Sequence, residues 1–533
     1  MQDESNTTNR RELLKGALAA GVVAGVNPVL KAAEELSSAA IGGTQGKSIA
    51  AAQRDLIRTE NAKPGTKDWM LTNTRVDPKT KYRCPWVEGY CSHTSIRAGE
   101  KLKVMVSTNP VSSFTVDIYR LGYYNGDGGR LVQHMGPFKG QVQPDPDTGH
   151  ERLRECRWEP SVEFAIPQDW VSGVYVGKLT SEREGLQSYV IFIVRDDRPC
   201  DFLFQCSDTT WAAYNRWPSE WALYNDGKKR WYCGPNVKVS WDRPYGKCGT
   251  LNLIDQPLSQ GSGEFLMWEF PLAFWLEKEG YDVSYISNVD THADAAGLMR
   301  AKGFLSVGHD EYWSREMYDN MLGAVAKGLS AAFFSGDTCW GLIPFLPSSA
   351  GAPHRIITRL GQFGPLEPDA LKQYPEYALF KHSAPTEANL IGARNAYPYC
   401  GVQDWICTDE KHWIYANTGM KHGDSISNIV GWEWMGIPAD IPGLSVVAEG
   451  KMKYNKEEGA YAATVYPGPK DNWVFNAASI WWPDGLSAPP GYKSPTWLDK
   501  SKSPKGVELS PRGPDARVQK ITANLLSRFR GIS

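Results

Sequence analysis

A histidine and a carboxylate stand two residues apart in the segment Val307–Ser314, which reads V-G-H-D-E-Y-W-S. An apolar run precedes this segment and helical spacing follows it, so the sequence predicts His309 and Glu311 at a turn between a strand and a helix. In open α/β sheets, ligands bind at the carboxyl ends of the strands. Imidazole and carboxylate at such a turn favour metal binding or acid–base chemistry, whereas an acyl-enzyme needs Ser or Cys there. In the structural alternative, His309 bonds a carbonyl group and Glu311 caps the following helix.

Four further polar clusters lie in predicted loops, and each contributes groups that suit ligand binding. They read D-T-T-W-A-A-Y-N at 208–215, W-D-R-P-Y at 241–245, S-G-D-T-C-W at 335–340 and G-W-E-W at 431–434. Three of them follow predicted strands, so they are expected at the sheet edge that carries His309. For the tyrosines, the structural alternative is a buried hydroxyl that is bonded within the core. For Glu433 it is an exposed loop carboxylate.

The elements that must position these clusters are of two kinds. From Trp86 to Val194, short segments of alternating polar and apolar residues stand between turn residues, which predicts a β-sandwich domain. From Asp201, apolar strands alternate with segments of helical spacing at 267–279 and 315–327. This alternation predicts an α/β domain whose mostly parallel sheet has helices on both faces, in a glutamine-amidotransferase-like topology.

The predicted organisation has five parts. They are a signal peptide at 1–40, an extended segment at 41–85, the β-sandwich at 86–197, the α/β catalytic domain at 198–486, and a C-terminal extension with a surface helix at 487–533.

An arginine pair precedes a short apolar run near the N-terminus. Arg10 and Arg11 are followed by E-L-L-K and then by the weakly hydrophobic segment 16–26. This pattern resembles a twin-arginine (Tat) export signal of bacteria, with Asn9 and Leu13 as mild departures. The run is too short for a stable membrane span, which needs about 20 residues. The resemblance implies export through the Tat translocon and a periplasmic or secreted protein, and an amphipathic helix is the alternative.

Composition excludes several classes of function. The net charge of -2 and the lack of a basic cluster argue against nucleic-acid binding. No later segment is long and apolar enough to span a membrane, so we expect no membrane contact of the mature protein. The 10 cysteines lack C-x-x-C spacing, which disfavours a zinc cluster. In an exported protein some of them can pair, and the pairing stays open.

In their order along the chain, the clusters resemble the large (β) subunit of N,N-dimethylformamidase and its relatives. The matching words are T-W-x-A-Y-N, R-P-Y, the Asp290-Thr291-His292 turn, G-H-x-E-Y-W-S, F-F-S-G and G-x-E, spread over 86–486. Each word is weak by itself, but their succession is specific.

The resemblance implies a mononuclear iron, as Fe³⁺, that is held by two tyrosinates and one glutamate. Carried over motif by motif, these ligands are Tyr214, Tyr245 and Glu311. Hard oxygen donors of this kind suit ferric iron. His309 would then stand beside the metal, where it could move a proton between water and a leaving amine.

Two more carboxylates complete the predicted site. Glu433 of G-W-E-W is the second acid–base candidate. Asp337 stands where the family usually has Asn, and an ionised Asp accepts hydrogen bonds but donates none. This departure puts a small-amide substrate in question, because a carbonyl oxygen needs a donor. A protonated Asp337 or an amine-bearing substrate would resolve it.

Together these observations predict an exported iron-dependent hydrolase of an amide or related C–N bond, in which metal-activated water attacks the carbonyl. The expected partners are an amide-like small molecule and either a second copy or a small accessory subunit, which the family enzyme has. One rival is a non-catalytic periplasmic binding protein whose aromatic pocket takes a sugar or peptide, as 21 Trp would allow. Another is a thiol amidotransferase-like enzyme using Cys339, which is weaker because the turn after Val307 has no Cys.

Overall fold

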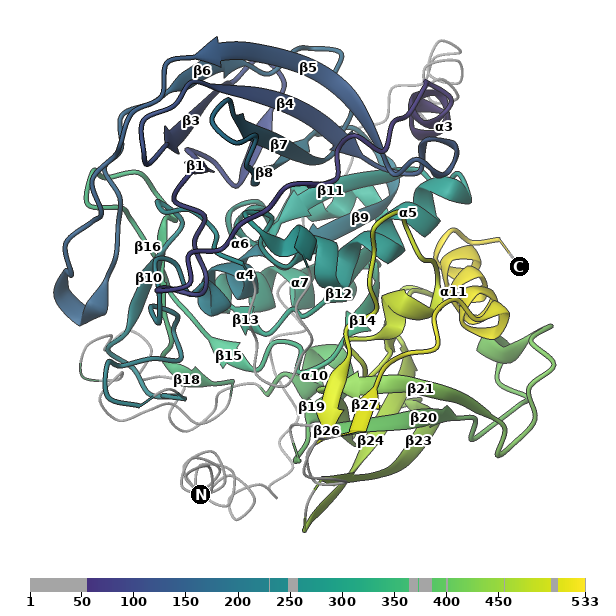
Figure 1. Cartoon of the computed structure of the whole chain (residues 1–533). Coiled ribbons are helices and arrows are strands. Elements are labelled where there is room, and N and C mark those ends of the chain that lie inside the picture. Colours follow the sequence, from purple (N-terminus) through teal and green to yellow (C-terminus); the bar gives the residue numbers. More distant parts are fainter. Residues whose placement is uncertain are drawn as a thin grey trace. The chain divides into compact units, whose positions relative to one another are not determined.

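The structure is a computed structural model of the chain (Figure 1). It describes residues 55–229, 231–247, 257–363, 372, 386–398, 401–454, 456–499 and 507–532. The chain divides into one unit at 1–56 and a second at 57–533, and the following concerns the second. The Tat-like segment lies outside the described residues, and export therefore stays a prediction.

Two antiparallel or mixed sheets enclose a common core in the first part of this unit. One sheet has the order β1-β3-β6 and the other the order β2-β8-β7-β4-β5. Alternate side chains of both sheets meet in one hydrophobic cluster, which includes Val104, Val116 and Phe192. The strands are β1 (Glu88–Cys91), β2 (Ser95–Arg97), β3 (Lys101–Ser107), β4 (Phe114–Leu121), β5 (Gly129–Phe138), β6 (Val162–Ala165), β7 (Gly173–Ser181) and β8 (Gln187–Arg195).

A seven-stranded sheet forms the centre of the second part, in the order β11-β9-β12-β14-β25-β24-β23. β9, β12 and β14 are buried for nearly their whole length, which explains their continuous apolar sequences. The strands are β9 (Cys200–Cys206), β11 (Val283–Ser287), β12 (Ala301–Gly308), β14 (Ser330–Ser335), β23 (Ser445–Tyr454), β24 (Glu457–Pro467) and β25 (Trp473–Asn476).

The prediction of a mostly parallel α/β domain with helices on both faces is wrong. The seven-stranded sheet is mixed, because β23, β24 and β25 pair antiparallel. The other sheets of the described residues are small, and several are antiparallel, so strands clearly outnumber helices. They contain β10 (Lys238–Ser240), β13 (Tyr312–Trp313), β15 (Gly341–Leu342), β16 (Phe345–Leu346), β17 (Ile356–Thr358), β18 (Gly361–Gln362), β19 (Ala393–Asn395), β20 (Gly401–Ile406), β21 (Ser425–Trp432), β22 (Met435–Pro438), β26 (Trp497–Asp499) and β27 (Val507–Leu509). The strand–helix alternation around the His309 motif therefore does not continue into the later part of the sheet, where the strands pair antiparallel.

Helix α7 shows how the sequence fixes one element beside the site. It spans Arg315–Lys327, as its helical spacing predicts. The Ser314 hydroxyl accepts a hydrogen bond from the Met317 amide at 3.1 Å, and Gly328 ends the helix with φ 113°. The other helices are α3 (Leu56–Asn61), α4 (Asp208–Tyr214), α5 (Phe270–Lys278), α6 (Asn288–Ala293), α10 (Ala388–Ile391) and α11 (Ala516–Phe529).

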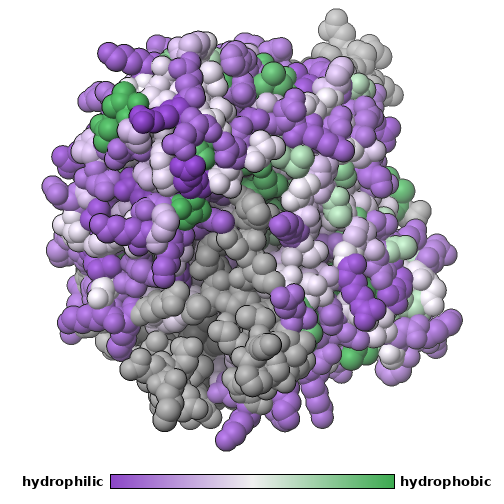
Figure 2. All heavy atoms as spheres, in the orientation of Figure 1, coloured by the Kyte–Doolittle hydropathy of each residue, from purple (hydrophilic) through white to green (hydrophobic). Residues whose placement is uncertain are grey.

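Three further observations concern the surface, the cysteines and the helices. On the face in Figure 2, hydrophilic residues predominate and exposed hydrophobic ones are scattered. The cysteines of the described residues are all free thiols, so no disulfide forms among them. Within the same residues, no helix combines the length and apolar character that a membrane crossing requires.

Candidate metal centre

The turn after β12 carries the residues His309, Asp310 and Glu311, all fully buried. Gly308 makes this turn possible, because its φ of 74° is a left-handed conformation that other residues avoid. A Cβ atom at Gly308 would also lie 2.8 Å from the Cβ of Trp268. The tight turn therefore brings a histidine and a glutamate together at the carboxyl end of a central strand.

Asp310 holds the turn in place. Its carboxylate accepts hydrogen bonds from Gln205 at 2.7 Å, Asn288 at 3.0 Å and Ser306 at 2.7 Å. Burial raises the pKa of Asp310 to about 6, although these bonds lower it. Because its side chain bonds to β9, β12 and α6, Asp310 fixes the directions of the residues on either side.

Two phenols bond to Glu311. The Tyr214 hydroxyl donates to Oε2 at 2.7 Å, and the Tyr224 hydroxyl donates to Oε1 at 2.6 Å. Tyr214 is the last residue of α4, and its hydroxyl lies 3.0 Å from that of Tyr224. Burial first, and then the Glu311 charge, raise the pKa of Tyr214 well above its usual value. Only a nearby cation would reverse that effect and favour a tyrosinate.

Three carboxylates contact the imidazole of His309. Nε2 lies 3.2 Å from Glu311 Oε2 and 3.1 Å from Glu433 Oε2, and Nδ1 lies 3.5 Å from Glu264 Oε2. Burial lowers the pKa of His309, but these three carboxylates raise it well above its usual value in the protein without metal. The rings of Trp268 and Trp432 pack edge-on to the imidazole, with centroids at 6.3 Å and 5.5 Å. The cluster is thus enclosed by aromatic side chains.

This cluster gathers three buried carboxylates. Glu264, Glu311 and Glu433 are each at most 3% exposed, and the imidazole of His309 contacts all three. Arg359 donates to the Tyr312 hydroxyl, which bonds the hydroxyl of Tyr224 beside Glu311. Buried carboxylates normally have partner cations, and a bound metal ion is one such partner. Ligand atoms of His309, Glu311 and Glu433 lie within 4.8 Å of one another, so these residues can hold a metal ion.

Glu433 and Asp337 come from neighbouring turns. Glu433 follows β21, and a Cβ at Gly336 would lie 2.3 Å from its carbonyl oxygen, so the two turns are in direct contact. Asp337 is fully buried after β14, with φ 53°. Beyond it, the Cys339 amide donates to the Asp310 carbonyl at 3.0 Å. The turn of Asp337 therefore packs against the turn of the site.

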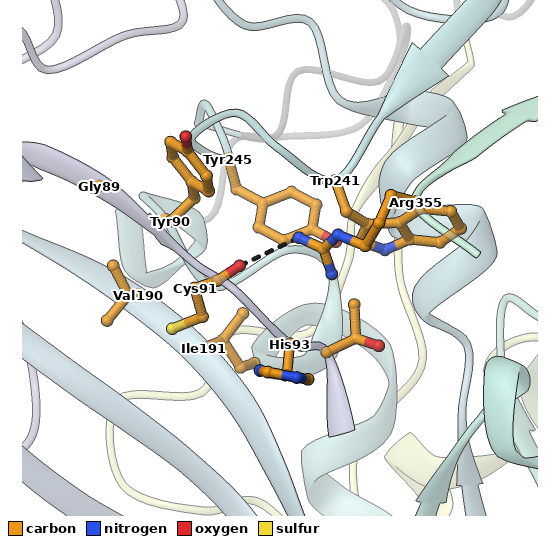
Figure 3. Close-up of a pocket in the computed structure, with 11 residues that line it drawn as sticks. Gly89, Tyr90, Cys91, His93, Val190, Ile191, Trp241, Tyr245 and Arg355 are labelled. Atoms are coloured by element: carbon orange, nitrogen blue, oxygen red, sulfur yellow. Dashed lines mark hydrogen bonds between the residues drawn. The ribbon is translucent and has the colours of Figure 1, made fainter. Parts of the chain in front are cut away.

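Tyr245 packs against the hydrophobic cluster that includes Tyr214 and Tyr224. Its side chain also lines a cavity with Trp241 and Arg355 (Figure 3). Tyr224 lies beside Glu311, and the sequence reasoning did not select it. A signal did exist, since a second Tyr-Asn pair at 224–225 follows the first at 214–215 by ten residues. The Leu223 amide donates to the Ala213 carbonyl at 2.9 Å, which sets the two pairs side by side.

A known protein family matches the part of the chain that builds this cluster. The family described as N,N-dimethylformamidase beta subunit-like, C-terminal, matches residues 115–494, which is more than half of the chain. This chain belongs to that N,N-dimethylformamidase beta subunit-like family. The match includes all of the turns that build the cluster, together with β4 to β25. The resemblance predicted from the motifs is therefore confirmed.

Other comparisons add little to the family assignment. None of the curated proteins matches the chain. Among solved structures, a family 123 glycoside hydrolase from Clostridium perfringens, in a study of glycolipid glycan hydrolysis, aligns with 9% identity and a TM-score of 0.10. The alignment covers 53% of this chain and 50% of that one, so it spans about half of the relative. A similarity this low carries no argument about fold or function.

Proposed function

We propose that this chain is an exported, iron-dependent hydrolase of an amide or related C–N bond. The observation that carries the proposal is the buried cluster of His309, Glu311 and Glu433, whose ligand atoms lie within 4.8 Å of one another, in a chain of the N,N-dimethylformamidase beta subunit-like family. Tyr214 and Tyr224 lie beside Glu311, and together these side chains offer the hard oxygen donors that suit a highly charged cation.

The donor set fits ferric iron. We propose Tyr214 and Glu311 as ligands, with Tyr224 as the second phenol because it is the one that contacts Glu311. Tyr245, which the motif favours, is the alternative for that place. Two phenolates and one carboxylate together offset a 3+ charge, and hard oxygen donors match a hard ion.

Iron in this position would lower the pKa of bound water and polarise a substrate carbonyl. His309 then has a clear role, because Nε2 faces both Glu311 and Glu433. The oxygen of water forms a bond to the carbonyl carbon, and the C–N bond breaks. His309 accepts the proton that water gives up and passes it to the leaving nitrogen. The products are a carboxylic acid and an amine.

Glu433 and Asp337 would support this proton transfer and orient the substrate. Glu433 holds His309 from the side opposite Glu264, so that the imidazole keeps one orientation. Asp337 is fully buried in the adjoining turn, where a protonated carboxyl could donate to a substrate oxygen. Export through the Tat route, supported by Arg10 and Arg11, and an accessory subunit or second copy are part of the same proposal.

Elemental analysis combined with visible absorption tests the proposal. We expect near-stoichiometric iron and a tyrosinate-to-iron charge-transfer band in purified protein, and turnover of simple amides. Tyr214→Phe and Tyr224→Phe should each remove or shift the band. Tyr175→Phe is the matched control, because this buried tyrosine donates to the Val171 carbonyl in the β-sandwich, away from the cluster.

Other outcomes separate the parts of the proposal. If Tyr245→Phe loses the band and Tyr224→Phe keeps it, the second phenol has been assigned to the wrong residue. Folded, colourless protein that does not take up added iron would overturn the iron assignment. Iron-loaded protein that binds amides without releasing an amine would favour the binding-protein alternative.

A further inference from the structure

A pair of histidines, His292 and His354, has no role in the proposed reaction. His292 belongs to α6, in the Asp290-Thr291-His292 turn that the sequence motifs include, and His354 precedes β17. Their ring centroids are 4.8 Å apart, and the ring of Phe345 packs against both. Within the described residues, these contacts share no residue with those of His309, so the pair is separate from the candidate metal centre.

The spacing of the two rings suits one shared metal ion. Imidazole nitrogens bind zinc at about 2.0–2.1 Å, and tetrahedral angles then place the centroids of two ligating rings roughly 5 Å apart. The observed 4.8 Å is close to that separation, and the planes of the rings cross at 68°. Packing of aromatic rings could give the same distance, so the nitrogen atoms must decide between the two explanations.

One nitrogen of His354 indicates a ligand. Nδ1 is buried and makes no hydrogen bond within the described residues. Buried polar atoms normally have a partner, so packing alone does not explain this nitrogen. The Arg355 amide donates to the Leu346 carbonyl at 2.9 Å, which anchors His354 in the hairpin of β16 and β17 beside Phe345.

The surroundings of His292 leave one of its nitrogens available. Nδ1 lies 2.8 Å from the Ser314 hydroxyl and 3.5 Å from Glu316 Oε2. A carboxylate only accepts hydrogen bonds, so this side favours a proton on Nδ1 and a lone pair on Nε2. Metal-binding histidines usually have this arrangement, with the second ring nitrogen bonded to a neighbouring acceptor.

Both imidazoles are in the form that binds metals. Burial lowers the pKa of His292 and that of His354, so both rings are neutral at neutral pH, and neutral imidazole is the ligand. The side chain of His292 is 14% exposed and that of Glu316 is 52% exposed, so an ion can reach the pair from solvent.

The turn that carries His292 is held rigidly. Asn320 of α7 donates to the carbonyls of Thr291 and His292 at 2.9 Å and 3.0 Å, and Arg195 pairs with Asp290 at 3.0 Å. A site on rigid elements binds its ion without first ordering its ligands.

We propose that His292 and His354 together bind one divalent transition-metal ion such as Zn²⁺, Ni²⁺ or Cu²⁺. Water would fill the remaining positions, and Glu316 would supply negative charge beside the ion. Imidazole suits these ions, whereas Mg²⁺ and Ca²⁺ prefer oxygen ligands. The site does not rest on the proposed hydrolase activity or on iron at the His309 cluster.

Calorimetric titration with Zn²⁺ tests the proposal on iron-loaded, full-length protein. We expect one Zn²⁺ to bind per chain, and Mg²⁺ at the same concentration to give no binding. His292→Ala and His354→Ala should each weaken zinc binding more than about tenfold, since even side chains that only support metal ligands contribute about 10- to 100-fold. Zinc should also raise the unfolding temperature of the wild type and of neither variant.

Two further variants serve as controls. His134→Ala removes an exposed histidine of β5 that bonds Asp117, and it should bind zinc as the wild type does. Glu311→Gln removes a ligand of the candidate metal centre and should keep this zinc site. Thermal unfolding without zinc shows whether each variant is folded.

Several results would overturn the proposal. They are zinc binding of unchanged affinity in both His292→Ala and His354→Ala, no zinc binding by the wild type, and loss of this binding in either control. Equal binding of Mg²⁺ and Zn²⁺ would overturn it as well, because carboxylates such as Glu316 would then hold the ion in place of the imidazoles.

Discussion

Two of the buried groups of charged residues in this protein differ in composition. In the first, Arg120 of β4 forms a bidentate ion pair with Glu277 of α5, at 2.7 Å and 3.0 Å, and both side chains are fully buried. In the second, Glu264, Glu311 and Glu433 contact the single imidazole of His309. The first is a one-to-one, balanced pair, and the second, with three carboxylates around one imidazole, is here called the unbalanced group.

Further hydrogen bonds support the first group, although Arg120 Nε has no partner among the described residues. Asn61 and Tyr285 donate to the two oxygens of Glu277 at 2.7 Å and 2.9 Å, and Ser172 accepts from Arg120 at 2.8 Å. Such a pair joins a strand of the β-sandwich to a helix of the second part and needs no ligand. The difference indicates that burial of charge alone does not mark a functional site, whereas several buried ligand atoms within 4.8 Å of one another offer the geometry that a metal ion needs.

The largest effect should follow from removing the central carboxylate of the unbalanced group. Glu311→Gln keeps the shape of the side chain but loses an acceptor for Tyr214 or Tyr224 and a charge for the metal. We expect iron to be lost and activity to fall more than about 100-fold, because even groups that only support metal ligands contribute about 10- to 100-fold. Iron content and amine release are measured together. Tyr175→Phe is again the control and should keep its iron and its activity.

The next largest effect is on stability, and it should arise at the balanced group. Glu277→Gln leaves the guanidinium of Arg120 buried without its counter-charge, which costs about 3–5 kcal/mol. Urea denaturation measures this free energy of unfolding. Replacing both residues, as in Arg120→Met with Glu277→Leu, should recover most of the loss. A double variant as unstable as the single one would show that the surrounding hydrogen bonds, rather than the ion pair, hold the two parts together.

The sequence predicted residues of the unbalanced group but not the balanced pair. His309 and Glu311 are two residues apart in the chain, so their common turn follows from local patterns of strand and helix. Arg120 and Glu277 are separated by 157 residues, and nothing local relates them. Tyr224 was missed for a similar reason, because it lies in a loop whose position depends on tertiary hydrogen bonds.

The fold shows the same limit. Helix α7 was predicted with its bounds, since helical spacing, a Ser cap and a terminal Gly are all local signals. The order of strands is not local, and β23 and β24 add to the sheet by antiparallel pairing that apolar runs do not reveal. The bounds given for the β-sandwich and the other domains remain predictions. The R-P-Y motif does not show where its loop places Tyr245, so the motif alone does not fix the role of this residue.

A smaller effect should appear at Asp208, which adds a further buried carboxyl near the unbalanced group. Burial raises its pKa to about 8, from an ordinary value of 3.8. Between these values the folded protein keeps a proton that the unfolded chain releases, so stability falls as pH rises, by at most about 1.4 kcal/mol per pH unit. Asp208→Asn keeps an acceptor for the Asn288 amide but cannot titrate.

The stability of metal-depleted Asp208→Asn should therefore decline less than that of the wild type between pH 5 and pH 8. Urea unfolding at both pH values gives the two slopes. Equal slopes would mean that Asp208 is ionised in the folded protein, which would add one more buried negative charge to those of the His309 cluster.

The smallest effect is expected at an exposed balanced pair, Arg97 and Asp197, whose atoms approach to 2.9 Å and whose side chains are 36% and 61% exposed. Asp197→Asn should change the free energy of unfolding by less than about 1 kcal/mol, because water screens both charges. Added salt should abolish this small difference, since exposed pairs are screened at about 0.15 M ionic strength and above. The same salt should leave the effect of Glu277→Gln nearly unchanged, because that pair is inaccessible to ions. Equal salt sensitivity of the two variants would show that burial is not what distinguishes the Arg120 pair.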